Sequence, residues 1–162
     1  MRILGLDPSI SSTGWGIIEM NGNRLSYVAD GFIPTSAKDT LSNRLHSIYT
    51  ELRHIIELYK PDEASIEITF LNTNPETSLK LSMARGVGFL MPAIYNIPLF
   101  EYEPNKIKKA LTGVGKADKK QVETMVKILL PGCQPKNNDS SDALAIAITH
   151  CNLRNSYNDH TV

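Results

Sequence analysis

The chain has 162 residues, 41% hydrophobic and 21% charged, a balance that suits one globular domain with a sizeable core. Lys and Arg together number 17, as do Asp and Glu, so the overall charge makes no case for a nucleic-acid partner. Cys133 and Cys151 are too few for a disulfide framework and lack zinc-site spacing. Neither a signal-peptide pattern nor a long apolar run occurs, so we expect a soluble, cytoplasmic protein.

The charges are nevertheless unevenly distributed along the chain. Residues 1–79 carry a net charge of −4, whereas residues 80–127 carry +5. The middle of the chain is therefore a basic segment.

The N-terminal part predicts three strands, at residues 2–7, 13–20 and 24–33. The first is an apolar run that ends on Asp7 and Pro8, which is typical of a buried strand entering a turn. Asn21-Gly22 indicates a hairpin between the other two. A carboxylate at the end of a buried strand needs a cation, a metal or hydrogen bonds, so Asp7 is the first candidate site residue. Alternatively, Asp7 only forms an Asx turn before Pro8.

Residues 41–59 predict an amphipathic helix, because apolar residues recur there at every third or fourth position. His46 and His54 lie on this helix without a second ligand type at metal spacing, so we expect them to be ordinary face residues. Residues 64–70 predict a fourth strand. It carries the second candidate carboxylate, Glu67.

The remaining chain alternates helices with one further strand. The predicted elements are a helix at 75–95, a strand at 97–102, helices at 104–111 and 118–130 around a loop at 112–116, and a last helix at 139–150. This order predicts an α/β fold with a five-stranded mixed sheet flanked by helices.

Asp139 and Asp142 open the last predicted helix three residues apart, so both project to one side of it. They could simply serve as an N-cap and a first-turn acid. However, residues 143–148 are almost wholly apolar and must pack on the sheet, which places both acids near Asp7 and Glu67. Four carboxylates without matched basic partners require a cation, and oxygen ligands select Mg²⁺ or Mn²⁺. The sequence therefore predicts a divalent metal site.

Several motifs now stand in a fixed order: Gly5-Leu-Asp7-Pro-Ser-Ile-Ser-Ser-Thr13-Gly-Trp-Gly16, Glu67 with Phe70, Leu79-Lys-Leu-x-x-Ala84-Arg-Gly86, Gly113-x-Gly115-x-Ala117-x-Lys119-x-Gln121-Val122, and Asp139-x-x-Asp142-Ala-Leu-Ala145. This pattern resembles the RuvC family of Holliday-junction resolvases over nearly the whole chain. The resemblance implies an RNase H-like nuclease domain at residues 1–151 and a C-terminal tail at 152–162. The chain departs from the family pattern at Ser9, Ile68 and Ser82-Met83, none of which is a carboxylate.

The resemblance also implies a homodimer that makes Mg²⁺-dependent nicks in two opposed strands of a four-way DNA junction, usually beside RuvA and RuvB. It assigns the metal-binding catalytic role to four carboxylates, Asp7, Glu67, Asp139 and Asp142. Lys108 and Lys119 match basic positions near the active site. Phe70 matches an aromatic residue that engages bases at the crossover.

The residue types suit this chemistry. Two metals about 3.5 to 4 Å apart can activate water and stabilise the departing oxygen of a phosphodiester, while a nearby lysine offsets charge or protonates the leaving group. Other basic residues predict a phosphate-tracking patch and further DNA contacts, namely Lys106, Lys109, Lys116 and Lys120, together with Lys80 and Arg85. Any one lysine could instead lie on a solvated helix face, and Phe70 could be a core aromatic.

Two other classes share part of this pattern. The start around Asp7 also resembles the phosphate-binding start of actin-like kinases and ATPases, but those proteins need two such lobes. A junction-binding protein without catalysis would normally have lost a carboxylate, and all four are present.

The predicted helix at 75–95 carries apolar residues on more than one side. Part of its surface would then be exposed in a monomer and covered by a second copy in a dimer. The alternative is that the strands and the first helix of the same chain cover all of it.

Overall fold

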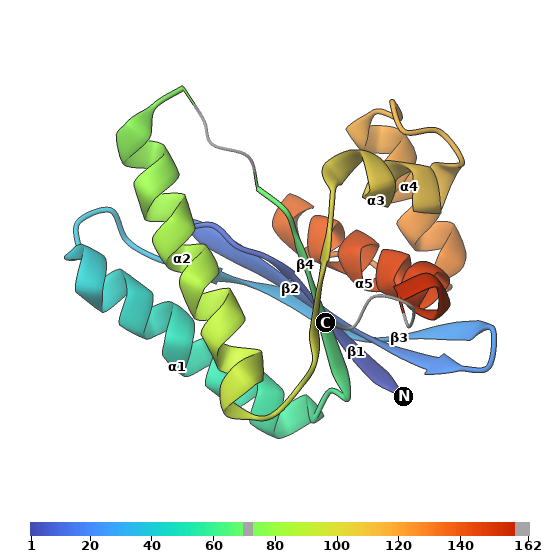
Figure 1. The fold of residues 1–162 in the computed structure, drawn as a ribbon, viewed down its shortest axis with the longest axis horizontal. Coiled ribbons are helices and arrows are strands. Elements are labelled where there is room, and N and C mark those ends of the chain that lie inside the picture. Colours follow the sequence, from blue (N-terminus) through green and yellow to red (C-terminus); the bar gives the residue numbers. More distant parts are fainter. Residues whose placement is uncertain (70–72, 158–162) are drawn as a thin grey trace.

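The computed structural model describes residues 1–69 and 73–157, the side chains of residues 155–157 excepted. Its elements are β1 (Arg2–Asp7), β2 (Ser12–Asn21), β3 (Arg24–Pro34), α1 (Leu41–Tyr59), β4 (Glu63–Glu67), α2 (Pro75–Ile94), β5 (Leu99–Tyr102), α3 (Pro104–Thr112), α4 (Lys119–Leu129) and α5 (Asn138–Tyr157). The strands form one mixed sheet with helices on both faces, which confirms the predicted fold class (Figure 1).

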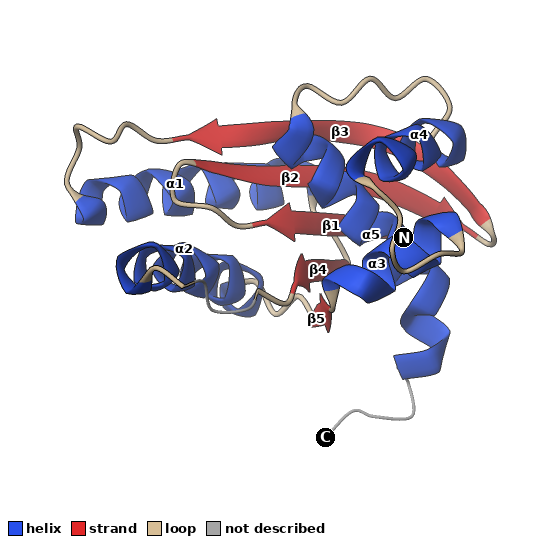
Figure 2. Cartoon of the chain, turned by 90° about the horizontal axis from the view of Figure 1, so that it is seen from above, coloured by secondary structure: helices blue, strands red, loops and turns tan. Residues whose placement is uncertain are grey.

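The sheet has the strand order β3-β2-β1-β4-β5 (Figure 2). β1, β2 and β3 are antiparallel neighbours, whereas β1, β4 and β5 run parallel. Leu6 is in register with Ile66, so Asp7 and Glu67, which directly follow these two residues, end neighbouring strands at the same edge. Residues in register on adjacent strands point to the same face, and both carboxylates therefore lie on one side of the sheet.

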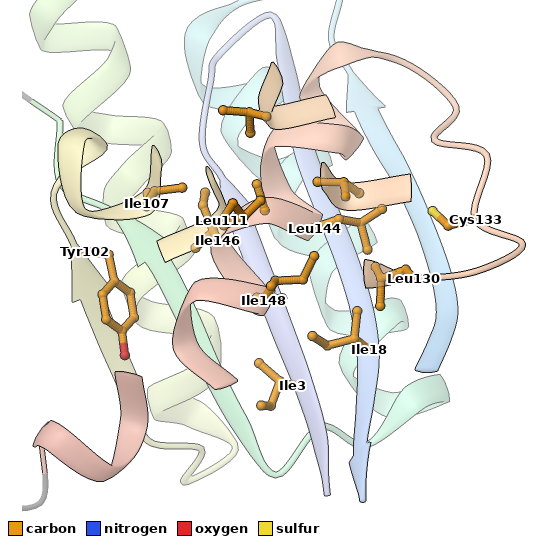
Figure 3. Packing of buried hydrophobic residues seen from close by; sticks show 14 of the residues in the cluster. Ile3, Ile18, Tyr102, Ile107, Leu111, Leu130, Cys133, Leu144, Ile146 and Ile148 are labelled. Atoms are coloured by element: carbon orange, nitrogen blue, oxygen red, sulfur yellow. The ribbon is translucent and has the colours of Figure 1, made fainter. Parts of the chain in front are cut away.

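The two faces are covered by different helices (Figure 1). α1 and α2 pack on one face over a cluster that includes Leu4, Leu6, Ile48, Leu52 and Met91. α3, α4 and α5 pack on the other, over Ile3, Ile18, Tyr102, Leu144 and Ile148 (Figure 3). Alternate residues of β1 thus serve opposite cores, as the two-residue period of a strand requires. Among the described residues, no helix combines the length and hydrophobicity needed to span a membrane.

α5 approaches β1 and β2 closely because the strands carry glycines beneath it. A Cβ on Gly5 would lie 2.0 Å from the carbonyl oxygen of Ala143, and one on Gly14 would lie 2.1 Å from that of Asp139. The first turns of α5 therefore rest directly on the backbone of the sheet. This contact carries Asp139 and Asp142 to the end of β1.

The boundaries of several elements follow local capping. The side chain of Asn74 accepts hydrogen bonds from two amides of α2, and Pro75 occupies its first turn. Asp118 and Gln121 form a capping box at the start of α4. α2 begins where the sequence predicts, and α4 begins one residue later, because Asp118 is its N-cap.

Three boundaries differ from the prediction by two residues or more. β5 begins at Leu99 rather than residue 97, because the amide of Ile97 donates to the carbonyl of Pro92 at 2.9 Å and closes the end of α2. β4 ends at Glu67 rather than residue 70. α5 continues beyond His150 to Tyr157, and Arg154 on this extension bonds Glu63 at 2.7 Å.

Candidate active site

Asp7 lies at the centre of an acidic cluster at the edge of the sheet. Burial, the largest cause, and the negative charges of Asp142, Glu67 and Asp139 together raise the pKa of Asp7 to about 7, against the lowering effect of Lys119. The structure thus brings together the four carboxylates of the sequence analysis, two from strand ends and two from α5. Their mutual repulsion in a partly buried place is the electrostatic signature of a cation site.

Two lysines face this cluster from α3 and α4. The ammonium group of Lys119 donates to a carboxylate oxygen of Asp142 at 3.0 Å. Burial raises the pKa of Asp142 although Lys119 lowers it, and the bond to Asp142 raises the pKa of Lys119 against the effect of burial. Burial and Asp142 raise the pKa of Glu67, and the charge of Lys108 opposes them. Both lysines therefore lie where the sequence analysis places them.

Asp139 is held by neutral donors. The hydroxyl of Ser12 and the side-chain amide of Asn137 both donate to its Oδ2, the second at 3.1 Å. Asn137 also accepts a bond from the amide of Ser140 at 2.9 Å and so caps α5. The interpretation of Asp139 as the N-cap is therefore wrong, because a residue before the helix fills that place.

A hollow of about 290 Å³ opens beside the cluster. Its lining combines acids, lysines and apolar side chains: Glu67, Pro104, Ile107, Lys108, Lys119, Val122, Asp142 and Ala145. Carboxylates that can hold a cation and ammonium groups that can face a phosphate thus share one surface. This arrangement suits the hydrolysis of a phosphodiester.

The donor set fits a hard divalent cation, but the side chains are not arranged as a ligand shell. Within residues 1–69 and 73–157, no three His, Cys, Asp or Glu side chains are gathered tightly enough to hold a metal ion. Asp142 faces Lys119, and Asp139 is bonded to Ser12 and Asn137. The charge of Lys119 relieves part of the repulsion among the acids, whereas the neutral donors orient Asp139 without compensating its charge.

The other predicted DNA-binding residues differ in their surroundings. Four lysines of the basic segment are exposed on α3, on α4 and between them: Lys106, Lys109, Lys116 and Lys120. Their placement on one pair of helices beside the hollow supports a phosphate-binding surface.

Lys80 and Arg85 on α2 make contacts within the chain. Lys80 pairs with Glu76 at 2.5 Å, one turn away. Arg85 pairs with Glu101 on β5 at 2.5 Å and lies 4.5 Å over the ring of Phe89. Both contacts give these residues a structural role within the chain. Phe70, the predicted base-engaging aromatic, lies outside the described residues.

Comparison with known proteins identifies the family of the chain. A family model described as "Crossover junction endodeoxyribonuclease RuvC" matches residues 3–150. The chain belongs to the RuvC family. The resemblance in the motifs is thereby confirmed.

RuvC proteins of two bacteria illustrate the relationship. The RuvC of Nitrobacter hamburgensis is 47% identical over 154 residues, which cover 95% of this chain and 91% of the relative. The RuvC of Ruegeria pomeroyi is 51% identical over 150 residues, which cover 93% and 90%. Both are called crossover junction endodeoxyribonucleases.

Solved RuvC structures share the fold. The RuvC of Thermus thermophilus, in complex with a Holliday junction substrate, superposes with a TM-score of 0.90 at 26% identity over 96% of each chain. The yeast mitochondrial Holliday junction resolvase Ydc2 superposes with a TM-score of 0.67 at 13% identity, a likeness of fold alone. The sheet and its two helical layers are therefore the RNase H-like fold of RuvC.

Proposed function

We propose that this chain is a structure-selective endonuclease that resolves four-way DNA junctions by paired, symmetric nicks in recombination and repair. Membership of the RuvC family over residues 3–150 supports the reaction and the substrate. The structural observation that carries the proposal is the convergence of four carboxylates, from the ends of β1 and β4 and the start of α5, beside a hollow that is also lined by Lys108 and Lys119.

The family is one of metal-dependent nucleases. We propose that Asp7, Glu67, Asp139 and Asp142 hold Mg²⁺, with two ions per active site and Mn²⁺ as a substitute. Their oxygen atoms are the ligands that hard divalent cations prefer. When bound, the metal supplies an activated water and stabilises the departing oxygen.

The lysine side chains near the acidic cluster act on the DNA. Lys108 and Lys119 line the hollow with Glu67 and Asp142, so their ammonium groups can offset charge on the phosphate that is cut or protonate the leaving oxygen. The exposed lysines of α3 and α4 extend this surface along the DNA backbone. Affinity should therefore depend strongly on salt.

A second copy of the chain is the proposed partner at α2. Four exposed apolar side chains form one stripe along this helix, Leu79, Met83, Leu90 and Ile94. Their spacing of four, seven and four residues places them on one face. A two-fold dimer would bury the stripe and present one acidic cluster to each of two opposed junction strands. The branch-migration proteins RuvA and RuvB are further proposed partners, supported by family membership.

Nicking of a synthetic four-way junction in Mg²⁺ tests the reaction. Each of Asp7→Asn, Glu67→Gln, Asp139→Asn and Asp142→Asn should abolish cleavage and leave junction binding largely intact, because each removes a metal ligand and little volume. Asp39→Asn, at an exposed position before α1, is the matched control. Nicking by the Asp7→Asn protein would refute the metal assignment, whereas a wild-type protein that binds the junction without nicking it would favour a junction-binding protein without catalysis.

Single-turnover cleavage tests the lysines. Lys108→Ala and Lys119→Ala should cut roughly 100-fold more slowly at saturating enzyme, because a transition-state contact affects rate more than binding. Lys127→Ala, an exposed change on α4, should cut normally. A Lys119→Ala protein that binds weakly but cuts at the normal rate once bound would reduce this lysine to a phosphate tether.

A further inference from the structure

The two oxygens of the Asp139 carboxylate have different surroundings. Oδ2 accepts hydrogen bonds from Ser12 and Asn137. Within the described part of the chain, no group donates to Oδ1. The carboxylate is thus held through one oxygen while the lone pairs of the other stay available.

The chemistry of the donors distinguishes Asp139 from Asp142. Asp142 bonds Lys119, a cation that compensates its charge. Ser12 and Asn137 are neutral, so they orient Asp139 and leave its negative charge uncompensated. Neutral donors that orient a carboxylate in this way commonly tune metal sites.

We infer that Ser12 and Asn137 are positioning residues, which hold Asp139 by Oδ2 so that Oδ1 is presented to the divalent cation. This inference rests on the proposed function, because it concerns the same metal site. It assigns a role to two residues that are not among the site residues predicted from the sequence.

The turn that carries Ser12 is braced by a buried arginine. Arg44 on α1 is 9% exposed and donates to the carbonyl of Ile10 at 3.1 Å and to the hydroxyl of Thr35 at 2.8 Å. The hydroxyl of Thr35 also donates to the carbonyl of Ile10. The turn begins at Asp7 and ends at Ser12, so one braced segment places Asp7 directly and Asp139 through the hydroxyl of Ser12.

The rival explanation is that these bonds merely join the start of α5 to β2. The two atoms of the Asn137 amide separate the roles, because Oδ1 caps the helix through Ser140 while Nδ2 bonds Asp139. Asn137→Ser keeps a good capping residue and removes the donor to Asp139. Ser12→Ala removes the other donor, and Ser12→Thr keeps a hydroxyl at the same position.

The test is Mn²⁺ titration of the full-length variants, followed by the electron paramagnetic resonance of free Mn²⁺. Ser12→Ala and Asn137→Ser should each weaken Mn²⁺ binding at least about 10-fold. The metal concentration for half-maximal junction nicking should rise by the same factor, with the rate at saturating metal largely restored. Ser12→Thr should recover wild-type affinity, and Ser11→Ala, an exposed change one residue earlier, should retain it.

Thermal unfolding of the metal-free proteins is the second measurement, and it tests whether the bonds to Asp139 only stabilise the fold. A lower melting temperature with wild-type Mn²⁺ affinity in both variants would overturn the inference, since that is the behaviour of a purely structural link. If the wild-type protein binds Mn²⁺ and nicks junctions, this result leaves the proposed function standing. If the wild-type protein does neither, the proposed function fails as well.

Discussion

At the scale of single residues, Asp7 links the acidity of the site to its use of metal. Its pKa of about 7 means that the metal-free carboxyl is substantially protonated at neutral pH. A cation must displace that proton before it can bind, so metal affinity should increase with pH. In the absence of metal, the proton on Asp7 contributes to the stability of the folded protein, because it neutralises one charge of the acidic cluster.

The first prediction concerns stability and pH. The pKa of Asp7 is raised from 3.8 to about 7, so between these values the folded protein keeps a proton that the unfolded chain has lost. The free energy of unfolding should therefore fall as pH rises through this window and stay lower above it. The Asp7→Asn protein does not show this fall in the free energy of unfolding, because an amide does not titrate. At about pH 8 without metal, it should be more stable than wild type by on the order of 2 kcal/mol.

Denaturant unfolding in chelator at about pH 5 and about pH 8 measures this difference. Groups away from the acidic cluster titrate equally in both proteins, including His150, whose pKa burial lowers, so their effects cancel in the comparison. Equal changes in the free energy of unfolding of the two proteins between these pH values would show that the surroundings of Asp7 do not raise its pKa. Addition of Mg²⁺ at about pH 8 should stabilise wild type more than Asp7→Asn.

Single residues also show where sequence reasoning succeeds. Asp7 is recognisable because an apolar strand ends on it, and Asp142 because an apolar helix follows it. Ser12 and Asn137 are not recognisable in this way. A hydroxyl at the start of a strand and a side-chain amide before a helix are ordinary residues of turns and helix caps. The ion pair of Arg85 with Glu101 could not be predicted either, because Glu101 lies on a strand that reaches Arg85 only in the fold. The contact of Arg85 with DNA stays a prediction.

At the scale of elements, the contact of α5 with β1 and β2 places half of the acidic cluster. The carbonyl of Ala143 occupies the space where a side chain at Gly5 would lie. A residue with a Cβ there would push the helix from the sheet and move both of its acids. The glycine is thus a requirement of the site as well as of the packing.

We therefore expect Gly5→Ala to destabilise the protein by about 3 kcal/mol or more, because backbone atoms cannot yield as a flexible side chain can. Junction nicking should fall even at temperatures where the variant remains folded. Gly115→Ala is the control for stability, since its Cβ would meet Asn105 at an ordinary 3.5 Å. Equal melting temperatures for the two variants would contradict the close approach of α5.

The ends of an element can be predicted from the sequence when the contacts that set them are made by residues close in the sequence. α1 begins and ends as predicted because its cap is local, with Thr40 accepting a bond from the amide of Asn43. The end of α5 could not be predicted in this way. Its extension is held by Arg154 against Glu63, a contact between residues far apart in the sequence.

At the scale of the whole molecule, symmetry decides whether two nicks are paired. The stripe on α2 includes Met83, which is 37% exposed. Gly86 lies on the same helix, and a Cβ there would meet no atom within 4 Å. An exposed apolar face of this kind suits a second helix. The sequence predicted the exposure of this surface because its apolar residues exceed what one core face needs.

Met83→Glu should yield a folded monomer that no longer makes paired nicks, because the charge would be buried at the two-fold axis. Sedimentation measures the oligomeric state, and a cruciform plasmid distinguishes single nicks from linear product. Leu58→Glu, at an exposed apolar residue of α1, should leave both properties unchanged. A wild-type protein that sediments as a monomer on junction DNA and still linearises the plasmid would overturn the dimer.

The position of α5 after all five strands of the sheet sets the order in which the parts of the nuclease are synthesised. A nascent chain that has reached only residue 137 already contains Asp7 and Glu67, but it lacks the other two acids. It also leaves Ile3 and Ile18 without the helix that covers them. If the four acids act as proposed, the enzyme becomes competent to cut DNA only after α5 has been synthesised, and a product that ends at residue 137 should be both unstable and inactive.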